Sequence, residues 1–140
     1  MSESGYSGTP LPKKLGLKPD MAALFIALPD SLSHLAEEVP GALQATDLVS
    51  ANASGLDYAH VFETSRAALE EHALGLKAML KPAGMLWISW PKKASKVPTT
   101  ITEDVLREIF LPTGLVDVKV CAVDEIWSGL KFMLRKELRP

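Results

Sequence analysis

The chain has 140 residues, a formal net charge of −2, and 47% hydrophobic against 23% charged residues. These values are typical of one ordinary globular domain, long enough to bury about two-thirds of the surface of its unfolded chain. The small net charge provides no general field that would attract nucleic acid or an anionic membrane. The longest apolar run, Met21 to Leu28, is far shorter than the ~20 residues that span a bilayer. We therefore expect neither nucleic acid nor membrane as a partner.

Cysteine and histidine exclude two kinds of site. Cys121 is the only cysteine, so no intrachain disulfide and no cysteine-based zinc site can form. His34, His60 and His72 fall on different predicted elements without the spacing of metal ligands, so we expect no metal. The first ten residues are polar and lack the apolar centre of a signal peptide, which predicts a cytoplasmic protein.

Residues 1–20 are predicted to form an N-terminal arm, and residues 21–140 a single α/β domain. The arm is rich in Ser, Gly and Pro at its start, which is typical of an extended segment. Met21 to Leu28 predicts the first buried strand, and Asp30 or Ser31 can cap the short helix that follows. The next predicted elements are a weak strand over 43–49, a strand over 58–62, a helix over 64–81, a turn over 81–84, a strand over 85–90 and a helix that begins with the capping box Thr100-Ile-Thr-Glu103.

The last segment has a different pattern. Residues 116–122 and 130–134 each alternate apolar with polar residues, and 124–129 lie between them. This pattern predicts two antiparallel strands at a sheet edge. The whole order of elements predicts a three-layer, Rossmann-like α/β sandwich, with a mainly parallel sheet and an antiparallel edge hairpin. Right-handed crossovers would bring four segments to one carboxyl edge: Asp30, Glu63 to Arg66, Lys92 to Lys96, and Asp124 to Trp127.

The basic loop after the central strand is the first candidate site. Lys92, Lys93 and Lys96, with Ser95 between them, can hold a phosphate or a carboxylate, because ammonium groups supply charge and a hydroxyl supplies a directional bond. Residues 81–140 hold ten Lys or Arg against seven Asp or Glu, which favours a small anionic ligand. The alternative is a solvated loop that keeps the protein in solution.

Three further residues have two interpretations each. Asp124 can pair with Lys93 or a ligand hydroxyl, and Trp127 can stack on a planar ring; alternatively, both pin the hairpin. Arg66, in the first turn of its helix, can clamp an anion or simply remain exposed. We find no persuasive general base or nucleophile, so no catalytic residue is assigned.

The segment LKPAGMLWISW and the final GLVDVKV hairpin resemble the C-terminal half of class I S-adenosylmethionine-dependent methyltransferases, in which an LKPGG-x-L turn precedes a central strand. The resemblance implies an S-adenosylmethionine site with an acidic residue after the second strand, a position that Asp47 would fill. The family's glycine-rich loop is replaced by Ala27-Leu28-Pro29-Asp30-Ser31, and the short spacing after the second strand implies that one strand and one helix of the family are deleted.

Three other segments, GYSGTPL, PKKASK and AVDEIWSGLKF, resemble an uncharacterised family of short bacterial proteins, a domain-of-unknown-function group. That resemblance implies no substrate. The sequence therefore favours a non-catalytic protein that binds a small anion or a nucleotide-like molecule through Lys92, Lys93, Ser95, Lys96, Asp124, Trp127, Arg66 and Asp30. Two alternatives stay open: a divergent S-adenosylmethionine-dependent transferase with Asp30 and Asp47 at the cofactor, and an interaction module that presents residues 127–134 to a partner. The oligomeric state is not predicted.

Overall fold

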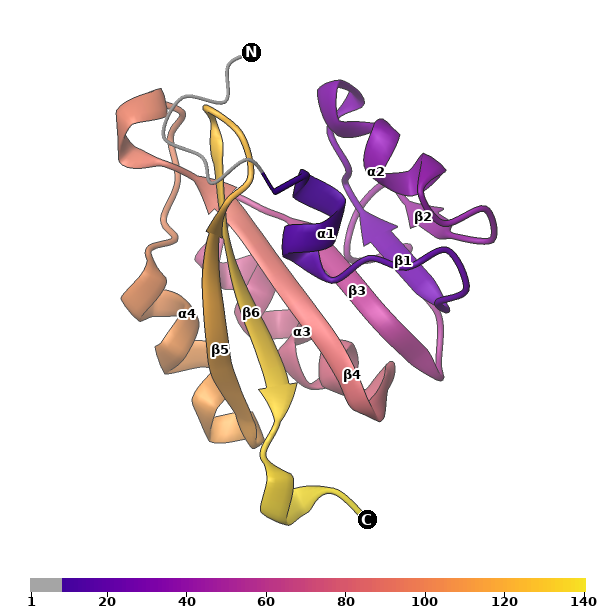
Figure 1. Ribbon diagram of the computed structural model, residues 1–140. Coiled ribbons are helices and arrows are strands. Elements are labelled where there is room, and N and C mark those ends of the chain that lie inside the picture. The colour runs from indigo at the N-terminus through magenta and orange to yellow at the C-terminus, as the bar shows by residue number, and fades with distance from the viewer. Residues whose placement is uncertain (1–8) are drawn as a thin grey trace.

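The computed structural model describes residues 9–140 and contains a six-stranded sheet with helices on both faces (Figure 1). The strands are β1 (Ala23–Ile26), β2 (Leu43–Ala45), β3 (Leu56–Phe62), β4 (Leu80–Pro91), β5 (Leu115–Ala122) and β6 (Trp127–Leu134). The α-helices are α1 (Leu11–Leu15), α2 (His34–Glu37), α3 (Arg66–Ala78) and α4 (Glu103–Phe110).

The strand order is β2-β1-β3-β4-β6-β5. The strands β2, β1, β3 and β4 run parallel, whereas β6 runs antiparallel to both β4 and β5. The predicted α/β sandwich, with a mainly parallel sheet and an antiparallel edge hairpin, is confirmed.

Each face of the sheet has its own apolar cluster. Helices α3 and α4 cover one face, where Leu69 and Phe110 are buried with Leu86 of β4. Helices α1 and α2 cover part of the other face, where Leu15 and Leu35 join the same cluster as Phe25 of β1. Burying such side chains is the main force that holds helices against a sheet.

The predicted arm takes part in the second cluster. Leu15 is fully buried and Leu17 nearly so. The indole nitrogen of Trp87 donates a hydrogen bond of 2.9 Å to the Leu15 carbonyl, which anchors α1 on the sheet. Residues 1–8 of the arm, with the GYSG part of the first family segment, lie outside the described residues.

The helix caps differ in part from those predicted. Helix α3 begins after Ser65, whose hydroxyl accepts a hydrogen bond from the Ala68 amide. The cap of α4 is Thr102, not Thr100, because the Thr100 hydroxyl is used elsewhere and accepts a 2.7 Å hydrogen bond from the Arg66 amide. The capping box is therefore not formed, although its helix is.

The predicted turn over Lys81 to Gly84 belongs to strand β4. The pairing of β3 with β4 shifts here, from Leu56 opposite Leu80 to Tyr58 opposite Met85. A Cβ at Gly84 would lie 2.5 Å from the carbonyl oxygen of Leu56. Glycine is therefore required by a close backbone approach rather than by a turn conformation.

The edge hairpin contains a second irregularity. The pairing of β5 with β6 shifts between Asp117 and Lys119, and this bulge changes which residues of β5 face inward. Val118 and Val120 are therefore about half exposed, whereas Leu115 and Cys121 are buried. Strand β6 begins at Trp127, so the connection is shorter than the 124–129 segment suggested.

Candidate functional site

The carboxyl ends of the parallel strands lie along the upper edge in Figure 1. From β1 the chain passes to β2 on one side, and then crosses to β3 on the other side of β1. In open α/β sheets a crevice for ligands forms at such a switch in direction. The strand order therefore places the primary candidate site between the ends of β1 and β3.

The backbone that follows β1 has an unusual conformation. Ala27 has a φ of +59°, in the left-handed region that alanine rarely adopts. Its amide donates a 2.9 Å hydrogen bond to the Ala45 carbonyl, which holds this turn against β2. Left-handed backbone costs a residue with a Cβ about 1 kcal/mol, so the surrounding structure imposes it. Asp30 follows, exposed, at the start of a 3-10 turn.

Glu63 follows β3, on the other side of this switch in strand order. Its Oε2 accepts hydrogen bonds of 3.0 Å from the amides of both Thr64 and Ser65. Its own amide donates to the Ser89 carbonyl. Glu63 therefore stabilises the start of α3, and this carboxylate is already engaged rather than poised as a general base.

Asp47 follows β2, next to β1 in the sheet. Its Oδ1 accepts a 2.8 Å hydrogen bond from the Ser50 amide, and bonds with Ser50 lower the pKa of Asp47 below its usual range. The carboxylate is therefore ionised at neutral pH.

The basic loop lies further along the same edge, after β4. The Lys92 amide donates a 2.7 Å hydrogen bond to the Ile126 carbonyl, which ties this loop to the hairpin connection. The Ser95 hydroxyl donates to the Lys92 carbonyl at 2.7 Å and accepts from the Val97 amide, so it shapes the loop. Lys93 and Lys96 line a surface hollow of about 580 Å³, together with Trp90, Pro91, Val97, Pro98, Thr99, Ile101, Thr102 and Glu103.

Asp124 and Trp127 stabilise the hairpin. Oδ1 of Asp124 accepts hydrogen bonds from the amides of Ile126 at 2.9 Å and Trp127 at 2.7 Å. The Trp127 ring meets Phe62 edge to face, with centroids 5.2 Å apart. No ion pair joins Asp124 to Lys93 in the described part of the chain. This geometry supports the structural interpretation of both residues.

Arg66 is not brought to the basic hollow. Its guanidinium pairs with Glu70 at 2.8 Å and with Glu108 at 2.9 Å, which joins α3 to α4. These two carboxylates raise the pKa of Arg66. The predicted site residues therefore separate into a basic loop beside the hairpin, an Asp30 beside β1, and an Arg66 engaged between two helices.

A buried polar chain was not predicted from the sequence. The Tyr58 hydroxyl lies 2.8 Å from Nδ1 of His60, and Nε2 of His60 lies 2.6 Å from the Ser89 hydroxyl. All three side chains are fully buried, and burial lowers the pKa of His60 to about 3, so the imidazole is neutral. A serine beside a histidine is a nucleophilic pair in many enzymes, but here no substrate can reach it. In the sequence, the polar chain is indicated only by the i, i+2 spacing of Tyr58 and His60, which puts both side chains on the same face of a strand.

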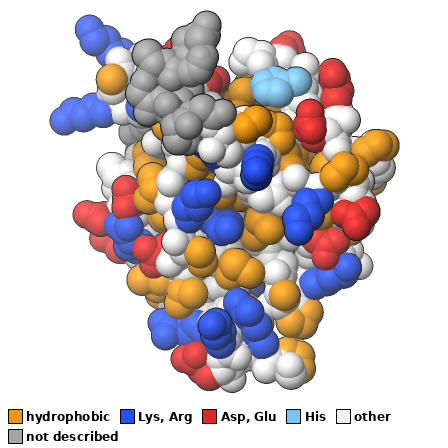
Figure 2. Space-filling model, in the orientation of Figure 1, with side chains coloured by type: hydrophobic (Ala, Val, Ile, Leu, Met, Phe, Trp, Pro, Cys, Tyr) orange, Lys and Arg blue, Asp and Glu red, His pale blue; other side chains and the backbone are white. Residues whose placement is uncertain are grey.

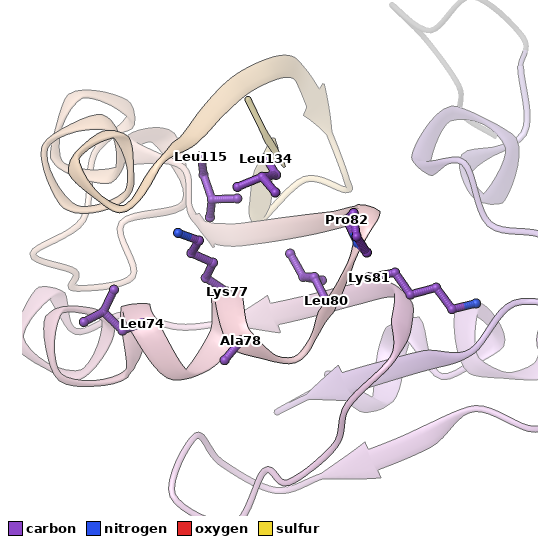
Figure 3. A pocket seen from close by; sticks show the side chains of 8 residues that line it. All are labelled: Leu74, Lys77, Ala78, Leu80, Lys81, Pro82, Leu115 and Leu134. Atoms are coloured by element: carbon purple, nitrogen blue, oxygen red, sulfur yellow. The ribbon is translucent and has the colours of Figure 1, made fainter. Parts of the chain in front are cut away.

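A hollow of about 400 Å³ lies at the opposite, amino edge of the sheet (Figure 3). The Lys77 ammonium group beside it donates to the Thr113 carbonyl, and Lys81 pairs with Asp57 at 3.0 Å. Both cations are thus engaged, and the hollow lacks converging polar groups that would fix a ligand. Its other lining residues are Leu74, Ala78, Leu80, Pro82, Leu115 and Leu134.

Residues 9–140 contain neither a metal-binding cluster nor a membrane-spanning helix. They contain no group of three or more His, Cys, Asp or Glu side chains arranged to hold a metal ion. None of their helices has the length and apolar character needed to cross a membrane.

Solved structures with a similar fold include several methyltransferases. An S-adenosylmethionine-dependent methyltransferase from Aquifex aeolicus is 18% identical, with a TM-score of 0.68 over 88% of this chain and 87% of that chain. A putative methyltransferase from Thermoplasma acidophilum is 9% identical, with a TM-score of 0.60 over 86% of this chain and 70% of that chain. Magnesium protoporphyrin IX methyltransferase from Synechocystis, with bound S-adenosylmethionine, is 11% identical, with a TM-score of 0.59 over 89% of this chain and 74% of that chain.

These matches confirm the Rossmann-like, methyltransferase-like scaffold that the sequence predicted. At identities this low they show the fold and not the activity. No protein-family model and no curated protein sequence matches the chain.

Proposed function

We propose that this protein is a divergent S-adenosylmethionine-dependent transferase whose adenosyl ligand binds between the carboxyl ends of β1 and β3. The observation that carries the proposal is the strand order, which puts a switch in direction at this point of a methyltransferase-like sheet. We expect binding of the adenosyl ligand to depend on backbone groups after β1 and on the Asp47 carboxylate after β2.

The residues present fit this ligand in two respects. Ala27 holds the left-handed turn that brings the backbone around the end of β1 without a glycine. Asp47 is ionised and follows β2, beside β1, where a carboxylate can accept a hydrogen bond from a ribose hydroxyl. When bound, S-adenosylmethionine supplies an electrophilic methyl group.

A thermal-shift and calorimetric titration with S-adenosylmethionine and S-adenosylhomocysteine tests the proposal. A ligand at 100 times its Kd stabilises by about 2.7 kcal/mol. Since a chain of 140 residues unfolds with an entropy of about 0.3 kcal/mol per kelvin, the midpoint should rise by about 9 °C.

Asp47→Asn is the diagnostic variant, because an asparagine oxygen can still accept from the Ser50 amide while the charge is lost. We expect its Kd for S-adenosylhomocysteine to rise about tenfold, or about 1.4 kcal/mol. Asp20→Asn, an exposed site before β1 at the other edge of the sheet, is the matched control and should bind normally. Absence of any shift or heat with both ligands refutes the proposal.

A second candidate is the function that the sequence favoured, binding of a small anion or a nucleotide-like molecule. The hollow beside Lys93 and Lys96 is the observation that favours it. Phosphate, ATP and S-adenosylhomocysteine titrated in parallel separate the two candidates. A shift with ATP that Lys93→Gln and Lys96→Gln abolish, with none from the adenosyl pair, would support the anion site in place of the transferase.

A further inference from the structure

The sheet face that carries α1 is covered over only part of its width. Strand pairing aligns Phe25, His60, Trp87, Lys131 and Lys119 in one row that runs from β1 to β5. Residues paired in this way point to the same side of a sheet. The first three are fully buried, whereas Lys131 is half-buried and Lys119 is exposed. None of the helices of residues 9–140 crosses β5 or β6 on the side that faces the viewer in Figure 1.

The two lysines of this row are direct cross-strand partners. Like charges placed opposite each other destabilise a sheet. Neither lysine forms an ion pair with a carboxylate of residues 9–140. Lys119 donates a 2.9 Å hydrogen bond to the Lys14 carbonyl, and the Lys131 ammonium lies 5.8 Å from the centroid of the Trp87 ring. Burial and then the charge of Lys119 lower the pKa of Lys131.

The next row on this face is apolar. Met85, Met133 and Val116 are paired across β4, β6 and β5, and each keeps part of its side chain accessible. Methionine is flexible and polarisable, which suits a surface that accommodates a partner. In Figure 2, which shows this face, Lys and Arg side chains and hydrophobic side chains occupy the centre, whereas Asp and Glu lie toward the margins.

We propose that this lysine–methionine face (Lys119, Lys131, Met85, Met133 and Val116) docks an acidic amphipathic segment of another protein. Carboxylates of the segment lie opposite the lysine pair, and its apolar side chains cover the methionine row. A second copy of this chain is a poor occupant, because it would bring the same positive charges together. A single-stranded nucleic acid is also a poor occupant, since binding it relies on aromatic stacking and none of the described aromatic side chains is exposed.

The docking face lies on β4, β5 and β6, away from the proposed adenosyl site between β1 and β3, so the test uses the ligand-free protein. The probe is a fluorescein-labelled helical peptide with leucines on one side and glutamates on the other, followed by fluorescence anisotropy. Lys119→Gln combined with Lys131→Gln removes the charges but keeps long side chains. We expect the Kd of the double variant to rise about tenfold or more, which corresponds to about 1.4 kcal/mol. Lys18→Gln combined with Lys136→Gln, two exposed lysines elsewhere, is the matched control and should bind normally.

A second readout does not depend on a substitution. In protein labelled with carbon-13 at the methionine methyl groups, the peptide should shift the signals of Met85 and Met133 but not that of Met79, which packs on the other face. The proposal is overturned if the wild-type protein does not bind the peptide, or if both double variants weaken binding equally. It is also overturned if a single-stranded oligonucleotide binds this face more tightly than the peptide does.

Discussion

Mild acid should destabilise this protein because His60 is buried as a neutral imidazole. Burial lowers the pKa of His60 from 6.5 to about 3, while the unfolded chain keeps the ordinary value. The stabilisation is therefore fully present above pH 6.5 and is lost progressively as the pH falls toward 3, since only the unfolded state takes up the proton in that range. Below pH 6.5 each pH unit lowers the free energy of unfolding by about 1.4 kcal/mol. A fall from about pH 7.5 to about pH 5 therefore removes about 2 kcal/mol of stability.

Urea unfolding curves at these two pH values measure this loss, and thermal midpoints should differ by about 7 °C. The pKa values of Asp47, Asp57 and Asp117 are all lowered, so these carboxylates lose their contribution only below about pH 4. His60→Gln should nearly abolish the difference between the two pH values, whatever its own stability, whereas His34→Gln at an exposed site should keep it. A His60→Gln protein that still loses about 2 kcal/mol would refute this reasoning.

Two further predictions concern single positions. Gly84→Ala should destabilise the folded protein by about 1–3 kcal/mol, because the new Cβ would meet the backbone oxygen of Leu56. Gly75→Ala, in the middle of α3 with nothing within 4 Å, should instead stabilise it by about 0.5–1 kcal/mol. Melting curves of the two variants that shift in the same direction would contradict this. Asp124→Ala should cost about 1–2 kcal/mol because the amides of Ile126 and Trp127 lose their acceptor. Asp124→Asn should keep most of that stability, and equal losses in the two variants would show that charge, not hydrogen bonding, holds the hairpin.

Local patterns in the sequence were sufficient to predict most of the elements. The buried stripe of α3, which includes Leu69, Ala73 and Leu76, follows from 3.6-residue spacing, and the apolar run of β4 follows from burial on both faces. Turn residues were less informative. Pro82 and Gly84 suggested a turn, but the glycine is needed because a neighbouring strand passes close to it. Such an approach depends on pairing with a residue far away in the chain, which no local window contains.

The site was harder to predict than the fold for a related reason. Charged loops such as Lys92 to Lys96 are conspicuous in a sequence, and they drew attention to the end of β4. The strand order, which depends on non-local pairing, instead places the switch in direction between β1 and β3. The residues there include Ala27, whose significance lies in its backbone angle and not in its side chain. Composition and spacing do not single out this position, which only the resemblance to methyltransferases placed where that family has its glycine-rich loop.

Charge distinguishes the two candidate sites on the carboxyl edge. Asp30, Asp47 and Glu63 follow β1, β2 and β3 near the switch in strand order, whereas Lys93 and Lys96 line the hollow after β4. S-adenosylmethionine carries a positive sulfonium and no phosphate, so it suits the acidic region, while a phosphorylated nucleotide suits the basic hollow. A ligand with both an adenosine group and phosphates would meet repulsion near these carboxylates and attraction at the hollow. The sign of the charge on a ligand that binds should therefore identify which of the two sites it occupies.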